Sequence, residues 1–112
     1  MMDANPKTVR NYVTPEGKVP YEEWIYGLKD KRTIARVLKR INRLRLGNFG
    51  DCKSVGSGVC ELRIHFGPGF RVYYGIVNDQ IVILLTAGAK GSQKKDIATA
   101  KSYWEDYQTN AN

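Results

Sequence analysis

The sequence predicts an α+β domain in which a curved, mainly antiparallel sheet of four to five strands carries two N-terminal helices and one C-terminal helix. Three observations predict this architecture. Residues 31–46 show a helical stripe of apolar residues. Residues 59–77 alternate apolar and polar positions around a Gly-Pro-Gly turn, and a nearly continuous apolar run follows at 80–88. A length of 112 residues with 42% hydrophobic residues fits one folded domain over residues 1–112.

The first elements are a short strand and a short helix. Residues 7–14 are rich in Val, Thr and Tyr, which favour extended backbone. Pro20 suits the first turn of a helix, and Glu22 and Glu23 lie near its positive end. The apolar residues of this helix share one face at helical spacing: Tyr21, Trp24, Ile25 and Leu28.

A second helix is expected over residues 31–46, with Asp30 as its cap. Its apolar stripe consists of Ile34, Val37, Leu38, Ile41 and Leu44. Its other face is basic and contains Arg32, Arg36, Lys39, Arg40, Arg43 and Arg45. Like charges four residues apart cost a helix some stability. The pattern therefore indicates either an ordinary solvated face or a surface that contacts nucleic acid or the ribosome.

Three strands and a helix complete the predicted fold. The strands are expected at residues 59–66, 70–77 and 80–88, with a tight turn at Asn78 and Asp79. The unbroken apolar run of the third strand indicates a central strand that is covered on both faces. Ser92 is expected to cap the last helix, whose buried stripe consists of Ile97, Ala100, Trp104 and Tyr107.

The hairpin around the Gly-Pro-Gly turn carries an unusual polar face. If Gly67, Pro68 and Gly69 form the loop, then His65 faces Arg71, Ile64 faces Val72 and Arg63 faces Tyr73. This register places four polar residues on one face (Arg63, His65, Arg71 and Tyr73) and four apolar residues towards the core (Leu62, Ile64, Val72 and Tyr74). Neighbouring like charges repel, so an anion between them would offset the cost.

A phosphate group is the anion that fits this face best. Arginine forks bind phosphate oxygens in pairs, a histidine moves protons near neutral pH, and a tyrosine can stack on a base. Lys90, in the loop after the predicted central strand, is expected to reach the same face. Simpler interpretations remain open. In these, Arg63 and Arg71 would pair with Glu61 or Asp79, Tyr73 would cover the sheet, and His65 would be inert.

Charge and composition restrict the partners. The formal net charge of +7 favours a polyanion such as RNA, DNA or an acidic protein. Cys52, Cys60 and the single histidine match no zinc spacing, so neither a metal nor a cofactor is predicted. No apolar run approaches the roughly 20 residues of a membrane helix. Since the N-terminus also lacks a signal-peptide pattern, a cytoplasmic protein without a membrane partner is expected.

Three motifs carry a resemblance to a known family: GNFGD, ELRIHFGPGFRVY and QKKDIATA. Over residues 21–107 the chain resembles the phage-derived, HigB-like branch of the RelE/ParE toxin superfamily, whose members are often described as addiction module killer proteins. The resemblance implies a RelE-like domain and a toxin of a type II toxin–antitoxin system. It also implies a cognate antitoxin, often a helix-turn-helix protein, whose acidic or amphipathic segment is expected to cover the basic groove.

The resemblance further implies an mRNA interferase, a ribosome-dependent endoribonuclease that inhibits translation without a metal or cofactor. In such enzymes the 2′-hydroxyl attacks the adjacent phosphate. Arg71 then corresponds to the phosphate-stabilising arginine, Arg63 to a second basic strand position, and Lys90 to the basic residue after the last strand. RelE carries lysines where this chain has Cys60 and Glu61, so His65 is the substitute proposed for the general base.

Seven further basic residues are expected to bind RNA or the ribosome, together with Tyr73: Arg32, Arg36, Lys39, Arg40, Arg43, Lys94 and Lys95. Two other functions stay open. A ParE-type toxin that inhibits gyrase would share the fold without the chemistry. An inactive toxin homologue would act only as a binding partner.

Overall fold

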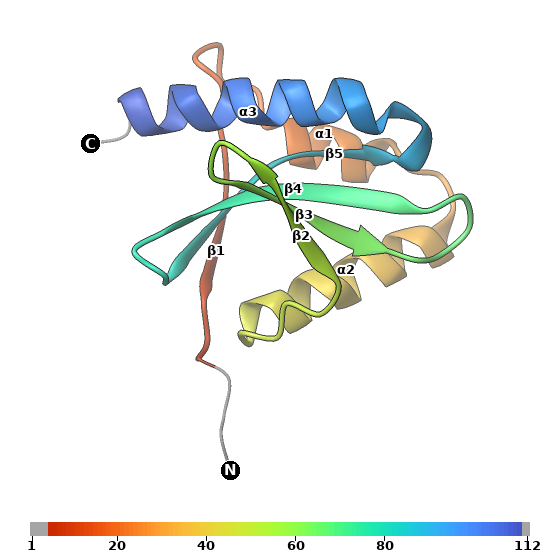
Figure 1. The fold of residues 1–112 in the computed structure, drawn as a ribbon. Coiled ribbons are helices and arrows are strands. Elements are labelled where there is room, and N and C mark those ends of the chain that lie inside the picture. Colours follow the sequence, from red (N-terminus) through yellow and green to blue (C-terminus); the bar gives the residue numbers. More distant parts are fainter. Residues whose placement is uncertain (1–4, 111–112) are drawn as a thin grey trace.

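The computed structural model describes residues 5–110 and confirms the α+β class (Figure 1). The N-terminal half contains β1 (Thr8–Asn11), α1 (Pro20–Gly27) and α2 (Lys31–Arg45). Four strands follow, β2 (Cys52–Gly56), β3 (Val59–Ile64), β4 (Phe70–Val77) and β5 (Ile81–Ala89). A short 3-10 helix at Lys90–Ser92 leads into α3 (Gln93–Asn110). The two N-terminal helices and the C-terminal helix are therefore where the sequence predicts them.

The five strands form one mixed sheet in the order β1-β5-β4-β3-β2. β1 runs parallel to β5, and every other neighbouring pair is antiparallel. The predicted third strand is β5, which lies inside the sheet between β1 and β4. Val82 and Leu84 of β5 pack into one core, and Ile83 and Leu85 pack into another. The expectation of a strand covered on both faces is confirmed.

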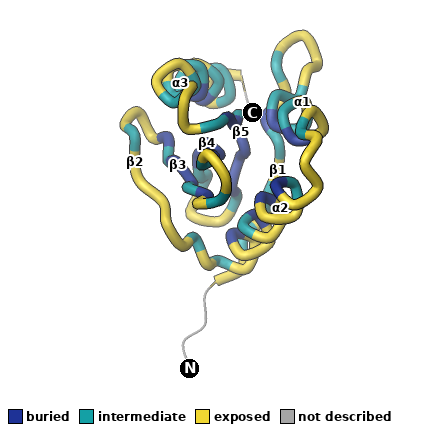
Figure 2. Tube along the Cα trace, turned by 90° about the vertical axis from the view of Figure 1, so that its right-hand side faces the viewer, coloured by how far each residue is buried: buried dark blue, intermediate teal, exposed yellow. Residues whose placement is uncertain are grey.

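The sheet lies between two helical layers. α1 and α2 cover one face and α3 covers the other, with the buried strands between them (Figure 2). Tyr21 and Ile25 of α1 are buried in the first core, where Trp24 and Leu28 pack against them. In the second core Ala100 and Trp104 of α3 are buried, with Ile97 and Tyr107 alongside. The predicted apolar stripes of α1 and α3 are confirmed.

The ends and the stripe of α2 agree with the prediction except at one residue. Asp30 caps the helix by accepting hydrogen bonds from Arg32 N at 3.1 Å and Thr33 Oγ1 at 3.0 Å. Val37, Ile41 and Leu44 are buried. Leu38 was expected in the same stripe but is 46% exposed. It follows Val37 by about 100° around the helix, and Val37 already faces the sheet.

The start of α3 differs in detail from the prediction. Ser92 directly precedes the helix, as expected of a cap. Its hydroxyl lies 2.5 Å from Asp96 Oδ2 and 3.1 Å from the Ala89 carbonyl. Both neighbours are acceptors, so the hydroxyl donates a hydrogen bond instead of accepting one from a helical N–H.

The hairpin register is two positions away from the predicted one. Arg63 faces Arg71, Leu62 faces Val72 and Glu61 faces Tyr73. The expected pairing of His65 with Arg71 is wrong, because β3 ends at Ile64 and the loop contains five residues rather than three.

Backbone hydrogen bonds explain the longer loop. Gly69 N–H donates to the Phe66 carbonyl at 3.0 Å, and Lys90 N–H donates to the Gly69 carbonyl at 2.9 Å. The backbone N–H and carbonyl of Gly69 therefore form hydrogen bonds outside the ladder between β3 and β4. A shift of two positions keeps each side chain on its face, so Arg63 and Arg71 still share one face while Leu62 and Val72 enter the first core.

The predicted turn at Asn78 and Asp79 is present, and the sheet contains one strand, β2, that the sequence did not locate. Asn78 and Asp79 have φ of 53° and 57°, and Gln80 N–H donates to the Val77 carbonyl at 3.0 Å, which confirms the tight turn between β4 and β5. β2 was missed. It is an edge strand in which four of the five residues are exposed, so it shows no alternation of apolar and polar residues.

Candidate functional site

The polar face of the β3–β4 hairpin is organised around a buried carboxylate. Glu61 has no exposed surface. It accepts hydrogen bonds from Arg63 Nε at 3.3 Å, from the Tyr73 hydroxyl at 3.2 Å and from Gln93 Nε2 at 2.7 Å. Arg71 Nε lies 3.6 Å from the same carboxylate. We call these five residues the Glu61 cluster.

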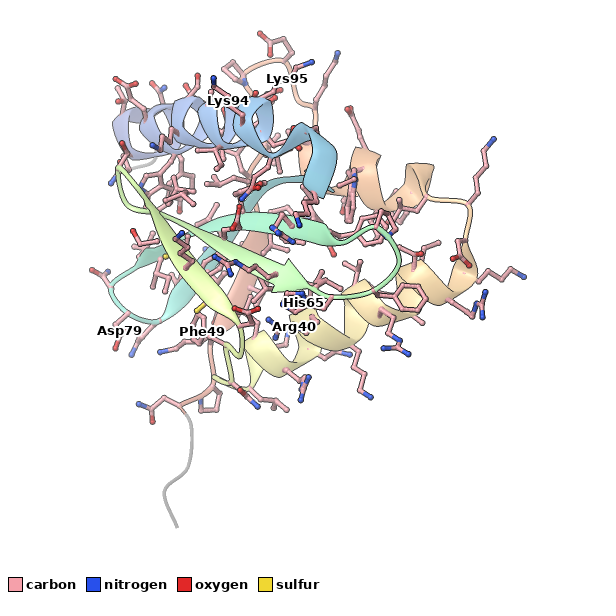
Figure 3. All side chains as sticks on the ribbon, turned by 45° about the vertical axis from the view of Figure 1, so that its right-hand side comes forward. Arg40, Phe49, His65, Asp79, Lys94 and Lys95 are labelled. Carbon is pink, nitrogen blue, oxygen red and sulfur yellow. The ribbon has the colours of Figure 1, made fainter. Side chains whose placement is uncertain are left out.

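The Glu61 cluster shows which of the two carboxylates, Glu61 or Asp79, the arginines pair with. Both Arg63 and Arg71 pair with Glu61, as one simple reading proposed. Asp79 does not take part, because its carboxylate lies 3.7 Å from Lys7 Nζ at the distant β4–β5 turn (Figure 3). The repulsion between the two guanidiniums is therefore reduced by a carboxylate of the protein itself.

Tyr73 is not placed to stack on a base. Its side chain has no exposed surface and is packed in the second core under α3. Burial, followed by the neighbouring Glu61 charge, raises the pKa of its hydroxyl above the ordinary value. A buried ring offers no face on which a base can stack, and this burial agrees with the alternative that Tyr73 simply covers the sheet.

Three of the four predicted catalytic residues meet beside the Gly-Pro-Gly turn. A hollow of about 360 Å³, here called the turn pocket, is lined by His65, Phe66, Gly67, Pro68, Gly69, Arg71 and Lys90. Gly69 has φ of +89°, and a Cβ there would lie 3.7 Å from both Arg71 Nη1 and Lys90 Cβ. The turn backbone thus packs directly against both cationic side chains.

A second hollow of about 410 Å³, the basic groove, lies between α2 and the end of β3. It is lined by Arg36, Lys39, Arg40, Arg43, Gly50, Asp51, Arg63, Ile64, His65 and Phe66. Five arginines and lysines thus face a single carboxylate. His65 and Phe66 line both hollows, so the groove and the turn pocket adjoin. Such a surface attracts a chain of phosphates.

His65 is oriented by Asp51. Its Nε2 bonds the Asp51 carboxylate, and its side chain is 69% exposed. The hydrogen bond from His65, followed by the nearby Arg63 charge, lowers the pKa of the Asp51 carboxyl. A histidine that donates from Nε2 keeps, in its neutral form, a free lone pair on Nδ1. His65 is therefore arranged to accept a proton at Nδ1.

Arg40 holds the groove together from inside. Its guanidinium donates to the carbonyls of Phe49 at 3.1 Å, Asp51 at 3.1 Å and Arg63 at 3.3 Å. Burial, followed by the neighbouring Arg43 charge, lowers the pKa of this guanidinium. Gly50 packs so closely that a Cβ there would lie 2.7 Å from Arg40 Nη1. Arg40 therefore connects α2 to β3 and to the segment that precedes β2, while it also lines the basic groove. Its contact with RNA stays a prediction.

The other predicted contacts divide into two groups. Arg36, Lys39 and Arg43 are exposed residues of the basic groove, and Arg36 also stacks over the Phe66 ring at 4.7 Å. Arg32, Lys94 and Lys95 line neither hollow. Lys94 and Lys95 project from the outer side of α3, away from His65 and Arg40 (Figure 3).

Comparison with known proteins gives the family. The sequence profile of a family described as phage-derived protein Gp49-like matches residues 23–105. The chain belongs to this Gp49-like family. A protein of Haemophilus influenzae, described as uncharacterized, is 49% identical over 81 residues, which is 72% of this chain and 82% of that protein.

Gp49-like proteins are toxin-like proteins of the addiction-module killer type, and such proteins in general have an antitoxin partner. The matched residues run from α1 into α3 and contain every residue of the two hollows. Within residues 5–110, no helix is long and apolar enough to cross a membrane. The same residues contain no group of three or more His, Cys, Asp or Glu side chains that could hold a metal ion.

Three further residues shape the candidate site of this Gp49-like chain, and of these the sequence pointed only to Glu61, as a possible partner of the arginines. Asp51 ends the GNFGD motif, Glu61 begins the ELRI motif and Gln93 begins the QKKDI motif. Glu61 carried a signal, because a charged residue in a strand of mostly apolar residues needs a partner when it is buried. Asp51 and Gln93 carried none, since their contacts depend on how separate elements pack.

Proposed function

We propose that this Gp49-like chain is the toxin of a type II toxin–antitoxin system and inhibits translation by cleaving mRNA on the ribosome. The observation that carries the proposal is the meeting of His65, Arg71 and Lys90 in the turn pocket. A proton-transfer group and two cations in one hollow suit the attack of a 2′-hydroxyl on the adjacent phosphate. The HigB-like and RelE-like resemblance supports the same reaction.

In the proposed reaction, His65 Nδ1 accepts the proton of the 2′-hydroxyl, since Nε2 is engaged by Asp51. The 2′-oxygen forms a bond to phosphorus, and the bond from phosphorus to the 5′-oxygen breaks. Arg71 and Lys90 stabilise the negative charge that develops on the phosphate oxygens. The Lys90 ammonium gives a proton to the departing 5′-oxygen, and solvent returns both side chains to their starting states.

The basic groove would hold the RNA on either side of the scissile phosphate. Arg36, Lys39 and Arg43 are exposed on α2 and face the same hollow as Arg63. Cations at this spacing bind successive phosphates and release counterions, so affinity should fall steeply with salt. A helix-turn-helix antitoxin would neutralise the toxin by laying an acidic segment over this groove.

Expression without an antitoxin, followed by mapping of mRNA ends, tests the proposal. Wild type is expected to arrest growth and to produce mRNA ends only when ribosomes are present. Arg71→Lys keeps the charge but loses the planar fork, so cleavage should fall by about 10²-fold. The control Arg10→Lys changes an exposed arginine of β1 outside both hollows and should behave as wild type. Full toxicity and cleavage by Arg71→Lys would contradict the proposal.

A second candidate is an inactive toxin homologue that only binds a partner. Arg71 is 7% exposed and the guanidiniums of both strand arginines are engaged by Glu61, which favours a structural role for them. The same experiment separates the candidates. Growth without arrest and without cleavage supports the inactive homologue, and a DNA-damage response with intact translation supports a ParE-type gyrase inhibitor.

A further inference from the structure

We propose that Glu61 is a positioning residue, which holds Arg63 and Arg71 in place for a single phosphodiester group. This inference rests on the proposed function of the same site. Glu61 does not touch the substrate, because its side chain has no exposed surface. It acts through the two arginines that do line the hollows.

Each guanidinium has an inner side, its Nε atom, which faces Glu61, and an outer side, its terminal nitrogens. Arg63 and Arg71 both approach Glu61 Oε1 through Nε, at 3.3 Å and 3.6 Å. Their terminal nitrogens lie on the outer side. Arg63 Nη1 lies 4.0 Å from Asp51 in the basic groove, and Arg71 Nη1 reaches the Phe70 carbonyl at 3.3 Å beside the turn pocket. Terminal nitrogens are the donors that bind phosphate oxygens in pairs.

Charge gives the second argument. Arg63 and Arg71 are direct cross-strand partners, and like charges in that position repel. One carboxylate between two guanidiniums leaves a single net positive charge on the trio. The net positive charge of the trio attracts the negative charge of a phosphodiester. Arg71 Nε is buried without a hydrogen-bond partner, which shows that the contact to Glu61 is set by charge more than by a hydrogen bond.

Helix α3 fixes the carboxylate itself. Gln93, the first residue of α3, donates to Glu61 Oε2 at 2.7 Å, and Tyr73 donates to the same oxygen at 3.2 Å. Because Gln93 and Tyr73 occupy Oε2, the Oε1 atom of Glu61 remains available to the two arginines. The position of the arginine pair therefore depends on how the start of α3 docks.

Glu61→Gln in the purified full chain tests the proposal, because it keeps the shape and removes the charge. Cleavage of ribosome-bound mRNA in a single turnover should fall by about 10²-fold, since small misplacements of catalytic groups have effects of this size. Affinity for a non-cleavable 2′-deoxy oligonucleotide should stay equal or rise, because the site gains positive charge. The control Glu105→Gln removes an exposed acid of α3 and should change neither constant.

Gln93→Ala keeps every charge and covers the case in which Glu61→Gln does not fold. It should reduce cleavage less than Glu61→Gln, leave oligonucleotide affinity unchanged and speed hydrogen exchange at the Nε–H of Arg63. Wild-type cleavage by both variants would overturn the proposal, as would a folded Glu61→Gln with weaker oligonucleotide binding. If wild type cleaves nothing while the binding and exchange results hold, the proposed function fails and the positioning of the arginines stands.

Discussion

At the scale of single residues, similar side chains have different tasks according to what they contact. Arg40 and Arg43 belong to the same basic face of α2. Arg40 gives its donors to three backbone carbonyls, whereas Arg43 is exposed at the groove. Their identical chemistry in the sequence hides this difference, since only the packing of β3 and of the segment before β2 against α2 provides the carbonyls.

Arg40→Ala should therefore destabilise the protein, and Arg43→Ala should weaken RNA binding. Leaving the carbonyls of Phe49, Asp51 and Arg63 without their donor should lower the free energy of unfolding by about 2 kcal/mol. Arg43→Ala should change that free energy by less than about 0.5 kcal/mol. Urea denaturation and oligonucleotide titration of both variants measure the two effects, and equal stabilities would contradict the assigned roles.

Asp51 gives a pH dependence at the residue scale. Hydrogen bonding from His65 lowers the pKa of Asp51 in the folded state below its ordinary value of 3.8. Its contribution to stability is therefore present above that value and is lost as pH falls through the lower, folded-state pKa. Acid titration of wild type and Asp51→Asn should show different stabilities near neutral pH that converge in strong acid. A gap that persists there would show that the carboxylate charge is not its source.

At the scale of elements, the junction between β5 and α3 requires close packing. A Cβ at Gly88 would lie 2.0 Å from Asp96 Oδ2 and 2.9 Å from Ser92 Oγ. Gly91, in the 3-10 helix, has no atom within 4 Å of such a Cβ. The two glycines are close in sequence, but only at Gly88 would an added Cβ require the Asp96 and Ser92 side chains to move.

Gly88→Ala should move the start of α3 away from the sheet, and Gly91→Ala should not. Overpacking of this kind costs about 1–3 kcal/mol. Because Gln93 begins α3, the displacement should also weaken its hydrogen bond to Glu61 and reduce cleavage. Thermal unfolding and cleavage assays of the pair provide the measurement. Wild-type behaviour of Gly88→Ala would mean that α3 tolerates a looser fit.

An element can be predicted from the sequence when a local pattern of residues specifies it, and not when contacts between distant segments do. α2, β4 and α3 were predictable because local patterns of apolar residues specify each of them. The β3–β4 register was not, because it depends on hydrogen bonds from Gly69 to Phe66 and from Lys90 to Gly69. For the candidate site, His65, Arg71 and Lys90 were found from residue type and family motif, whereas the contact between Glu61 and Gln93 joins segments that only the fold brings together.

At the scale of the whole molecule, two cores on either side of the sheet bury tyrosines. Burial is the first cause that raises the pKa of Tyr12, Tyr21, Tyr73 and Tyr74, to about 12 for Tyr21. Their folded-state pKa values lie above the unfolded value of 10.0, so the stability that they contribute is complete below pH 10 and is lost as pH rises beyond it.

An alkaline titration followed by tyrosinate absorbance should therefore show a late step that coincides with loss of secondary structure. Circular dichroism over the same pH range gives the second signal. Tyr73→Phe should reduce the amplitude of the late step by one tyrosine. Ionisation of all seven tyrosines near pH 10 without unfolding would contradict the burial seen in the two cores.

The parallel pairing of β1 with β5 has a consequence for the order in which the protein can form. Thr8 pairs with Ile81, so the first strand has no neighbour until nearly the whole sheet has been synthesised. Lys90 and Gln93 follow β5. The basic groove combines segments from both sides of β2, and the turn pocket needs Lys90. A growing polypeptide therefore contains α2 with its basic face but neither a finished sheet nor the turn pocket. The activity proposed above belongs only to chains whose translation has passed Gln93.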